Sequence, residues 1–292
     1  MRLHNPLEIA LADIPVRRSS LMIGGARTAI WEYGANDAPE TIVLVHGFRG
    51  THHGLLSLVA AMPEVRFIAP DLPGFGESAV FAVEHSLDAY ATWLRELLDA
   101  LDPDARAVVL GHSFGSLVVA RQVAALAPRR IVLVNPIAEN ALTGPDRVMT
   151  NLAIFYYWMG ARLPRGLGNA LLSSGLITRV MSEVMAVTKS RALRAWIHRQ
   201  HADHFSEFVS RESLLDAFRA SVSDDIRAHS SEFPEGTLLV VGEKDAIAPL
   251  PASRRLHAAM PGSTLQVIGG VGHLIHYETP LALARVLREH IK

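Results

Sequence analysis

The sequence predicts an α/β fold in which a mostly parallel central sheet is flanked by helices and interrupted by an inserted helical cap. Short, continuous apolar runs alternate with segments of helical periodicity, which is the pattern of parallel β-α-β units. This alternation stops over residues 137–225, where the pattern is helical with short breaks at residues 144–145, 164–166 and 175, and then resumes. We therefore expect one α/β core formed by residues 1–136 and 226–292, with a helical cap or lid at 137–225.

The composition excludes several classes of protein. The 292 residues are 49% hydrophobic and 20% charged, which is typical of a globular chain with a sizeable core. A formal net charge of −1 gives no electrostatic reason to bind nucleic acid or an anionic membrane surface. The absence of cysteine excludes disulfides, thiol catalysis and cysteine-ligated zinc. We find neither a signal-peptide pattern nor an apolar run near the roughly 20 residues of a membrane span, so we expect a cytoplasmic protein.

The elements follow in order along the chain. Two short strands around a Gly-Gly turn predict an N-terminal hairpin within residues 19–33. Continuous apolar runs predict buried strands at residues 41–45, 66–69, 108–110, 130–135, 236–241 and 264–268. Ser86 is a suitable N-cap for one of the amphipathic helices. These helices are predicted at residues 52–62, 85–101, 251–260 and 280–291.

The strand at 108–110 runs into a G-x-S-x-G motif at residues 111–115, and a helical pattern begins at once. Strand, motif and helix together are the context of a nucleophile elbow, in which a strained turn presents the serine hydroxyl to substrate. Gly111 and Gly115 lack the side chains that would collide in so tight a corner. The helix also points its amide end at the site, where negative charge develops. Ser113 is therefore the candidate nucleophile.

Two further polar residues follow later strands of the predicted sheet. Asp245 comes after the strand at 236–241, and His273 comes after the strand at 264–268. In open α/β sheets, sites lie outside the carboxyl ends of the strands. A serine hydroxyl needs a base to accept its proton, and the base needs a partner that fixes its tautomer. Ser113, His273 and Asp245 fill these roles, and their order along the chain is the one expected for this architecture.

Five motifs occur in sequence, at residues 46–48, 71–78, 111–115, 242–245 and 272–273. On these motifs the chain resembles the α/β-hydrolase fold superfamily, and specifically a capped serine hydrolase of the carboxylesterase type. The resemblance covers residues 19–136 and 226–292, whereas the cap matches in position only. It implies an oxyanion hole formed by the backbone N–H groups of Phe48 and Phe114.

Other residues compete for the catalytic roles. His276 lies three residues after His273 and is a second candidate for the base. Glu243 is a second candidate for the acid. In some members of the superfamily the acid follows the strand after the elbow helix, but here that position is Asn135, which has no carboxylate.

The remaining polar residues of the motifs are expected to support the structure. Asp71 belongs to a turn that its carboxylate would stabilise. His46 and His112 flank the site, and we expect His52 and His53 to cap or flank the next helix. No spacing among the 14 histidines resembles a set of metal ligands, so we predict no metal and no cofactor.

The nucleophile selects among reactions. Relatives that open epoxides or displace halide use aspartate at the elbow, whereas Ser113 indicates acyl transfer. Relatives that cleave carbon–carbon bonds of dienoic ring-fission products usually carry Trp two residues after the catalytic histidine, where this chain has Ile275. We predict a serine carboxylic-ester hydrolase with an acyl-enzyme intermediate. A lactonase or carbon–carbon bond hydrolase is the alternative, and a non-catalytic ligand-binding module is an alternative of another class.

The predicted cap is rich in Leu, Met, Phe, Tyr and Trp, which indicates an apolar pocket for a small to medium ester, and this ester is the small-molecule partner that we expect. Tyr157, Trp158 and Ile275 are the candidate pocket residues. An inward arginine would pair with a substrate carboxylate, and a monoester such as a monoalkyl phthalate would then fit. Most cap arginines are expected on solvated helix faces: Arg147, Arg162, Arg165, Arg179, Arg191, Arg194 and Arg199.

Overall fold

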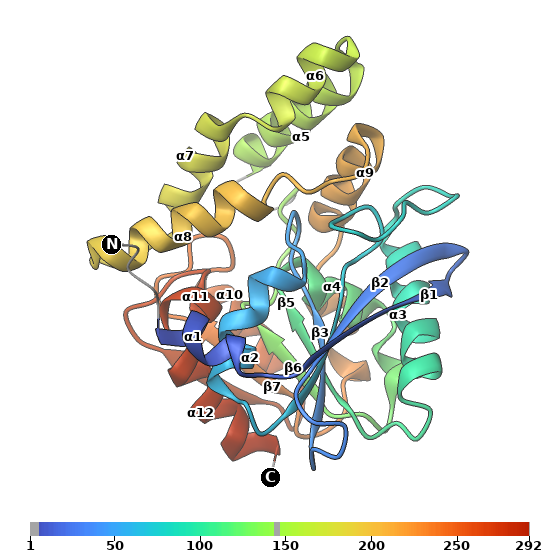
Figure 1. The fold of residues 1–292 in the computed structure, drawn as a ribbon, viewed down its shortest axis with the longest axis vertical. Coiled ribbons are helices and arrows are strands. Elements are labelled where there is room, and N and C mark those ends of the chain that lie inside the picture. Colours follow the sequence, from blue (N-terminus) through green and yellow to red (C-terminus); the bar gives the residue numbers. More distant parts are fainter. Residues whose placement is uncertain (1–5, 143–146, 292) are drawn as a thin grey trace.

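One eight-stranded sheet runs through the centre of the protein (Figure 1). The computed structural model describes residues 6–142 and 147–291. The strands are β1 (Val16–Ile23), β2 (Ala26–Tyr33), β3 (Thr41–Val45), β4 (Arg66–Pro70), β5 (Val108–His112), β6 (Ile131–Val134), β7 (Leu238–Gly242) and β8 (Thr264–Ile268). They lie in the order β1-β2-β4-β3-β5-β6-β7-β8. The β1–β2 and β2–β4 pairs are antiparallel and the other pairs are parallel. The predicted fold class is confirmed.

Helices cover both faces of this sheet. Among the described residues of the core, they are α1 (Pro6–Ala12), α2 (Leu56–Ala61), α3 (Leu87–Leu101), α4 (Phe114–Arg121), α10 (Leu250–Ala259), α11 (Ile275–Glu278), α12 (Pro280–Ile291) and the short 3₁₀ helices η1 (His52–Leu55), η2 (Val123–Leu126) and η3 (Ile226–Glu232). Val43 and Val45 of β3 pack in one core with α3, α4 and α10. Ile42 and Leu44 pack in a second core with α2 and α12. Because side chains alternate along a strand and both faces are covered, the inner strands are apolar throughout.

Local sequence explains most element boundaries. The Ser86 side chain caps α3 as its position predicts, accepting a hydrogen bond from the Ala89 N–H at 3.2 Å. The hairpin begins at Val16, earlier than its apolar pattern suggests, because most side chains of β1 face solvent. The pattern gave no sign of α1 and α11, since each offers too few residues to show helical periodicity.

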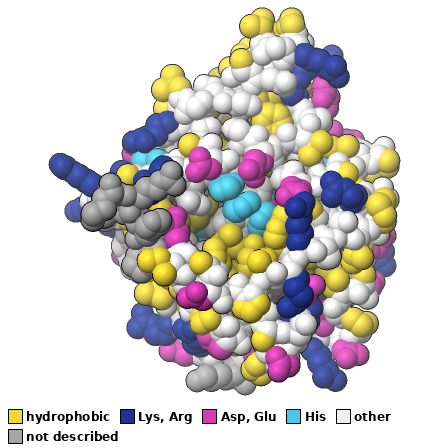
Figure 2. All heavy atoms as spheres, in the orientation of Figure 1, with side chains coloured by type: hydrophobic (Ala, Val, Ile, Leu, Met, Phe, Trp, Pro, Cys, Tyr) yellow, Lys and Arg dark blue, Asp and Glu magenta, His cyan; other side chains and the backbone are white. Residues whose placement is uncertain are grey.

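Between β6 and β7 the chain forms a group of helices that lies over the carboxyl ends of the strands (Figure 1). We call residues 137–225 the insert. Its helices are α5 (Arg147–Arg162), α6 (Arg165–Leu172), α7 (Gly175–Met185), α8 (Arg191–His204) and α9 (Arg211–Val222). Figure 2 shows hydrophobic side chains on its outer surface. The break expected at residues 144–145 lies outside the described residues. No helix in the described ranges is both long enough and apolar enough to cross a bilayer.

Candidate active site

The turn between β5 and α4 is sterically demanding. Ser113 stands at its tip with φ 53° and ψ −119°, a left-handed conformation that is strained for a residue other than glycine. A Cβ atom on Gly111 would lie 2.7 Å from the carbonyl oxygen of Gly115. A Cβ atom on Gly115 would lie 2.1 Å from the carbonyl oxygen of Val45. Only glycine fits at these two positions, and the tight corner they allow turns the Ser113 side chain into the cavity above the sheet.

The structure brings Ser113, His273 and Asp245 together from the ends of β5, β8 and β7. His273 Nε2 lies 2.9 Å from Ser113 Oγ, and His273 Nδ1 lies 2.8 Å from Asp245 Oδ2. The second carboxylate oxygen, Asp245 Oδ1, accepts hydrogen bonds from the N–H groups of Ile247 and Ala248 at 2.8 and 2.9 Å. A serine, a base and an orienting acid are therefore in hydrogen-bond contact in the order that nucleophilic catalysis requires.

The environment of Asp245 keeps its carboxylate charged. Burial alone would raise the pKa of this carboxyl group. The neighbouring His273 and the two backbone N–H donors outweigh burial, and the pKa of Asp245 is lowered below its ordinary value. An ionised Asp245 holds the proton of His273 on Nδ1, and this leaves Nε2 free to accept the proton of Ser113.

His276 and Glu243, the other candidates for the base and the acid, lie outside the hydrogen-bonded chain of Ser113, His273 and Asp245. His276 is 4% exposed and packs its ring against His112, with centroids 4.4 Å apart. Burial lowers the pKa of His276 well below its ordinary value, so this imidazole is neutral. Glu243 Oε2 accepts a hydrogen bond from the Gly270 N–H at 2.8 Å, and this bond stabilises the turn before His273. Neither side chain forms a hydrogen bond with Ser113 or His273 among the described residues.

Asn135 joins the loops that carry the acid and the base. Its Oδ1 accepts a hydrogen bond from the Gly242 N–H at 2.9 Å, and its Nδ2 donates to the His273 carbonyl at 2.8 Å. It is fully buried and has a positive φ of 47°. From the sequence, Asn135 stood out only because it has no carboxylate where some relatives carry the acid. Its place at the end of a central strand, beside the site, was the signal that could have identified a positioning residue.

Phe48 and Phe114 carry the two backbone N–H groups that the resemblance assigns to an oxyanion hole. Both residues line the cavity beside Ser113, and Phe114 begins α4. Neither backbone N–H donates to a protein acceptor in the described part of the chain. The loop of Phe48 is held by His46, whose Nε2 accepts a hydrogen bond from the Leu72 N–H at 2.9 Å. Burial lowers the pKa of His46 to about 4, so this ring is neutral and can accept that bond.

The Asp71 carboxylate stabilises a turn, as its position suggests. Its Oδ1 accepts hydrogen bonds from the backbone N–H and Nδ1 of His52, at 2.7 and 2.9 Å. Its Oδ2 accepts a hydrogen bond from the Glu77 N–H at 2.9 Å. Asp71 therefore connects the loop that follows Phe48 with the turn at residues 70–78.

A cavity of about 640 Å³ lies between the strand ends and the insert, and Ser113 and His273 line it. Its insert side is mostly apolar and includes Met149, Met181, Val184, Met185 and Phe218. A cavity of this size and character suits a small to medium organic molecule.

The three pocket residues proposed from sequence do not line this cavity. Trp158 is 40% exposed and stacks on Phe155 on the outer side of α5. Tyr157 is buried but does not line the cavity, and its ring packs against two residues that do, Phe48 and Phe218. Ile275 packs in the core that contains α2 and α12. The predictions were wrong because an aromatic run on a helix does not reveal which face turns inward when several faces are partly apolar.

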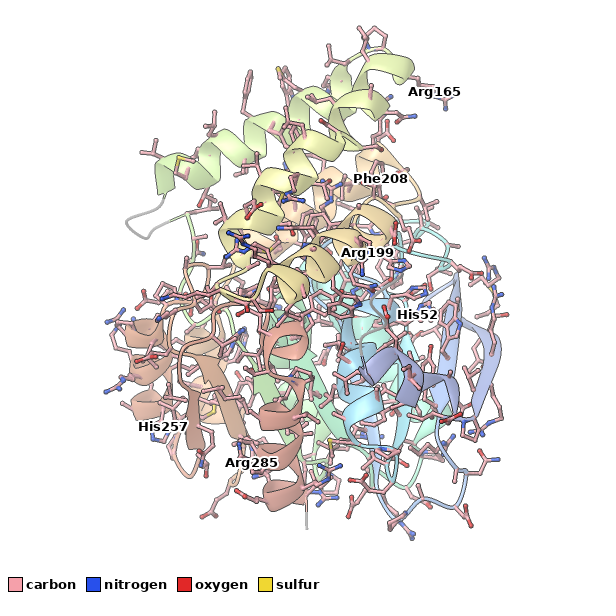
Figure 3. The ribbon with its side chains drawn as sticks, turned by 60° about the vertical axis from the view of Figure 1, so that its left-hand side comes forward. His52, Arg165, Arg199, Phe208, His257 and Arg285 are labelled. Atoms are coloured by element: carbon pink, nitrogen blue, oxygen red, sulfur yellow. The ribbon has the colours of Figure 1, made fainter. Side chains whose placement is uncertain are left out.

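The arginine that lines the cavity comes from the core. None of the eight insert arginines with described side chains lines the cavity, and Figure 3 shows Arg165 at the far tip of the insert. Arg49, which follows Phe48, is 2% exposed and lines the cavity. Its Nε donates to the Phe205 carbonyl and its Nη2 to the Leu172 carbonyl, each at 2.9 Å. No carboxylate among the described residues forms an ion pair with it.

Arg49 also connects the reaction site with the insert. Phe205 and Leu172 both belong to the insert, and the Arg49 guanidinium lies 4.9 Å from the ring centre of Phe205. Burial raises the pKa of the Tyr157 hydroxyl, and the positive charge of Arg49 opposes that rise. The inward arginine was expected in the insert, whereas Arg49 directly follows the motif at residues 46–48 of the core.

The sheet order, the Ser-containing turn after β5 and the loops that bring an acid and a histidine to it define an α/β hydrolase. Comparison with protein families agrees. Residues 42–286 match the alpha/beta hydrolase family, and the chain belongs to that family.

Two curated relatives and one solved structure show the range of similar proteins. The chain is 29% identical over 255 residues to the dihydrolipoyllysine-residue acetyltransferase component of the acetoin cleaving system of Pseudomonas putida, covering 87% of this chain and 64% of that relative. It is 26% identical over 288 residues to a 2-hydroxy-6-oxo-2,4-heptadienoate hydrolase of Pseudomonas putida, covering 93% of this chain and 95% of that relative. An esterase from Exiguobacterium antarcticum is 17% identical and superposes with a TM-score of 0.75, covering 94% of this chain and 99% of that one. This last likeness concerns the fold.

Proposed function

We propose that this protein is a serine carboxylic-ester hydrolase that works through an acyl-enzyme intermediate. One observation carries the proposal: Ser113 Oγ, His273 and Asp245 form a continuous hydrogen-bonded chain, with separations of 2.9 and 2.8 Å, at the base of a largely apolar cavity. The role of the insert in this proposal is to cover that cavity and select the ester.

In the first half of the reaction, Ser113 Oγ attacks the ester carbonyl carbon while His273 Nε2 takes the hydroxyl proton. Asp245 stabilises the imidazolium that forms. The carbonyl oxygen becomes an oxyanion, which accepts hydrogen bonds from the N–H groups of Phe48 and Phe114. Each such donor is worth roughly 3–4 kcal/mol of the barrier. As the carbonyl re-forms, the bond to the alcohol oxygen breaks, and His273 returns its proton to the departing alcohol.

In the second half, water replaces the alcohol. His273 Nε2 accepts a proton from water as the water oxygen attacks the acyl carbon. The same two backbone donors stabilise the second oxyanion, and the bond to Ser113 Oγ breaks with return of the proton. The products are a carboxylic acid, an alcohol and the original enzyme.

The position of Arg49 favours a substrate ester that also bears a carboxylate. It supplies a buried positive charge to the cavity wall, and no described carboxylate neutralises that charge. Burying an unpaired charge is costly, and an anionic ligand reduces the cost. The mostly apolar lining suits an alkyl or aromatic portion. A monoester of an aromatic dicarboxylic acid, such as a monoalkyl phthalate, combines both features.

The test is hydrolysis of p-nitrophenyl esters of increasing acyl length, followed by monoalkyl and dialkyl phthalates. Ser113→Ala is expected to lower kcat/KM by ~10⁴–10⁶ while the melting temperature stays near that of wild type. Monoalkyl phthalates are expected to exceed dialkyl phthalates in kcat/KM. Equal or faster turnover of the diesters would contradict the carboxylate preference, and a folded wild type without activity on any ester would contradict the esterase proposal.

A second function has one specific observation in its favour. The 26% identical relative from Pseudomonas putida is a 2-hydroxy-6-oxo-2,4-heptadienoate hydrolase, and this class of enzyme acts on a carbon–carbon bond. Against it, Ile275 stands where such enzymes usually carry Trp. Loss of the visible absorbance of a dienoate ring-fission product, measured beside the ester series, separates the two functions. Binding without turnover of either substrate would favour a ligand-binding module.

A further inference from the structure

Histidines gather where the insert meets the core. Figure 2 shows histidine side chains at the surface of this junction, with carboxylate side chains beside them. His53 lies in η1 on the core side, and His204 ends α8 on the insert side. Their rings stack with centroids 3.9 Å apart and an angle of 10° between planes. Glu207 follows on the insert side, and its Oε1 lies 3.2 Å from His204 Nδ1.

The distances in this group approach those of a metal site. Two ligand atoms bound to Zn²⁺ at about 2.0–2.1 Å with a tetrahedral angle lie about 3.4 Å apart. The 3.2 Å between His204 Nδ1 and Glu207 Oε1 is already close to that separation. One nitrogen of each histidine and one oxygen of Glu207 all lie within 4.8 Å of one another. The two insert ligands therefore already lie near their bound separation, and the His53 ring would have to turn out of its stack on His204 to supply the third ligand.

We propose that His53, His204 and Glu207 bind a divalent transition metal ion such as Zn²⁺, which fastens the insert to the core. Two imidazoles and a carboxylate are a common ligand set for Zn²⁺, with water in the remaining position. The ion would be structural or regulatory, because Ser113 and His273 lie elsewhere and need no metal for their chemistry.

The surroundings of His53 favour binding. The loop of His53 is firmly held. His52, which Figure 3 places on the core below the insert, stacks on Trp31 with centroids 3.5 Å apart and contacts Asp71. These contacts fix the residue that precedes His53, and His53 Nδ1 itself lies 3.2 Å from Thr51 Oγ1.

The position of the group suggests what binding does. His204 lines the cavity, as do Arg49 and Thr51 from the loop that precedes His53. An ion shared by η1 and the end of α8 would hold this edge of the cavity in one arrangement. We expect Zn²⁺ to raise the melting temperature by a few degrees and to slow turnover of the longest esters more than that of the shortest. Only the turnover effect rests on the proposed esterase function.

The test is titration calorimetry of untagged, chelator-treated protein with ZnCl₂ in the absence of substrate, accompanied by melting curves. We expect one ion per chain in wild type and no comparable binding in His53→Ala or His204→Ala. His229→Ala is the matched control, because His229 Nδ1 also lies 3.3 Å from a glutamate three residues on, Glu232 Oε1, but lacks a second histidine. The control should bind Zn²⁺ as wild type does.

Three outcomes would overturn the proposal. They are no Zn²⁺ binding by wild type, unchanged binding in both histidine variants, and loss of binding in His273→Ala, which would place the ion at the reaction site instead. Should a histidine variant fail to fold, Glu207→Gln at an exposed position is expected to weaken binding at least tenfold. Because calorimetry needs no turnover, a chain that binds Zn²⁺ but hydrolyses no ester would refute the esterase proposal alone.

Discussion

The strand ends and the insert differ in how firmly they hold their side chains. At the strand ends, His273 and Asp245 are each 5% exposed and have hydrogen-bond partners on both sides. In the insert, Met149 and Val184 line the cavity but are 64% and 63% exposed. The strand ends hold the proposed catalytic side chains in hydrogen bonds, whereas the insert presents exposed apolar side chains to the cavity. We therefore expect changes at the strand ends to remove the reaction and changes in the insert to alter which ester reacts.

The largest expected effect in this comparison is that of Asp245→Asn. Asparagine keeps the shape of the side chain but removes the negative charge, so the His273 proton is no longer held on Nδ1. We expect kcat to fall by ~10⁴ on a p-nitrophenyl ester, as in other triads that lose this acid.

Glu243→Gln is the matched control for Asp245→Asn. Glu243 follows the same strand, β7, but its carboxylate bonds the Gly270 N–H rather than the base. We expect this variant to keep activity within a few-fold of wild type. A large loss in Glu243→Gln together with a small loss in Asp245→Asn would transfer the role of the acid to Glu243.

The two regions also differ in how much of their structure could be predicted from the sequence. The strands and the relative positions of Ser113, Asp245 and His273 were predictable, because parallel strands bring their carboxyl ends to one edge of the sheet. The alternation of apolar runs and helices was enough to give the fold class. No comparable rule predicts how the insert helices pack on one another. Trp158 was therefore predicted to line the cavity, whereas Met149 and Met181 line it in the structure.

Contacts between distant segments were likewise invisible in the sequence. Arg49 meets Leu172 and Phe205 only after the insert has packed on the core. His53 and His204 lie in different parts of the chain, so a search for metal-ligand spacing could not associate them. Asn135 was recognised as a special position, but its role as a link between two loops needed the hydrogen bonds of the folded chain.

A smaller effect is expected at Arg49, where the two regions join. Arg49→Met keeps a long side chain but removes the charge and the bonds to Phe205 and Leu172. A charge-assisted hydrogen bond is worth about 1.5–3 kcal/mol, so we expect kcat/KM for a monoalkyl phthalate to fall roughly 10- to 100-fold. The loss on a neutral p-nitrophenyl ester should be at most a few-fold, with a rise in KM.

Arg199→Met is the control for Arg49→Met, because Arg199 belongs to α8 but does not line the cavity. It is expected to leave both substrates unaffected. An equal loss on charged and neutral esters in Arg49→Met would show that Arg49 only docks the insert, and the carboxylate preference would then need another cation.

The smallest effects separate the inner and outer faces of the insert. Met181→Ala removes three heavy atoms from the cavity wall, so we expect the optimum acyl length of p-nitrophenyl esters to shift upward by about two or three carbons. Trp158→Ala removes a larger side chain, but from the outer face, where it stacks on Phe155. It should leave the optimum unchanged and kcat/KM within about twofold of wild type.

The reverse result, with the larger shift in Trp158→Ala, would mean that α5 turns its aromatic face to the substrate during the reaction. The insert would then have to rearrange when substrate binds, while the hydrogen-bonded residues at the strand ends stay in place.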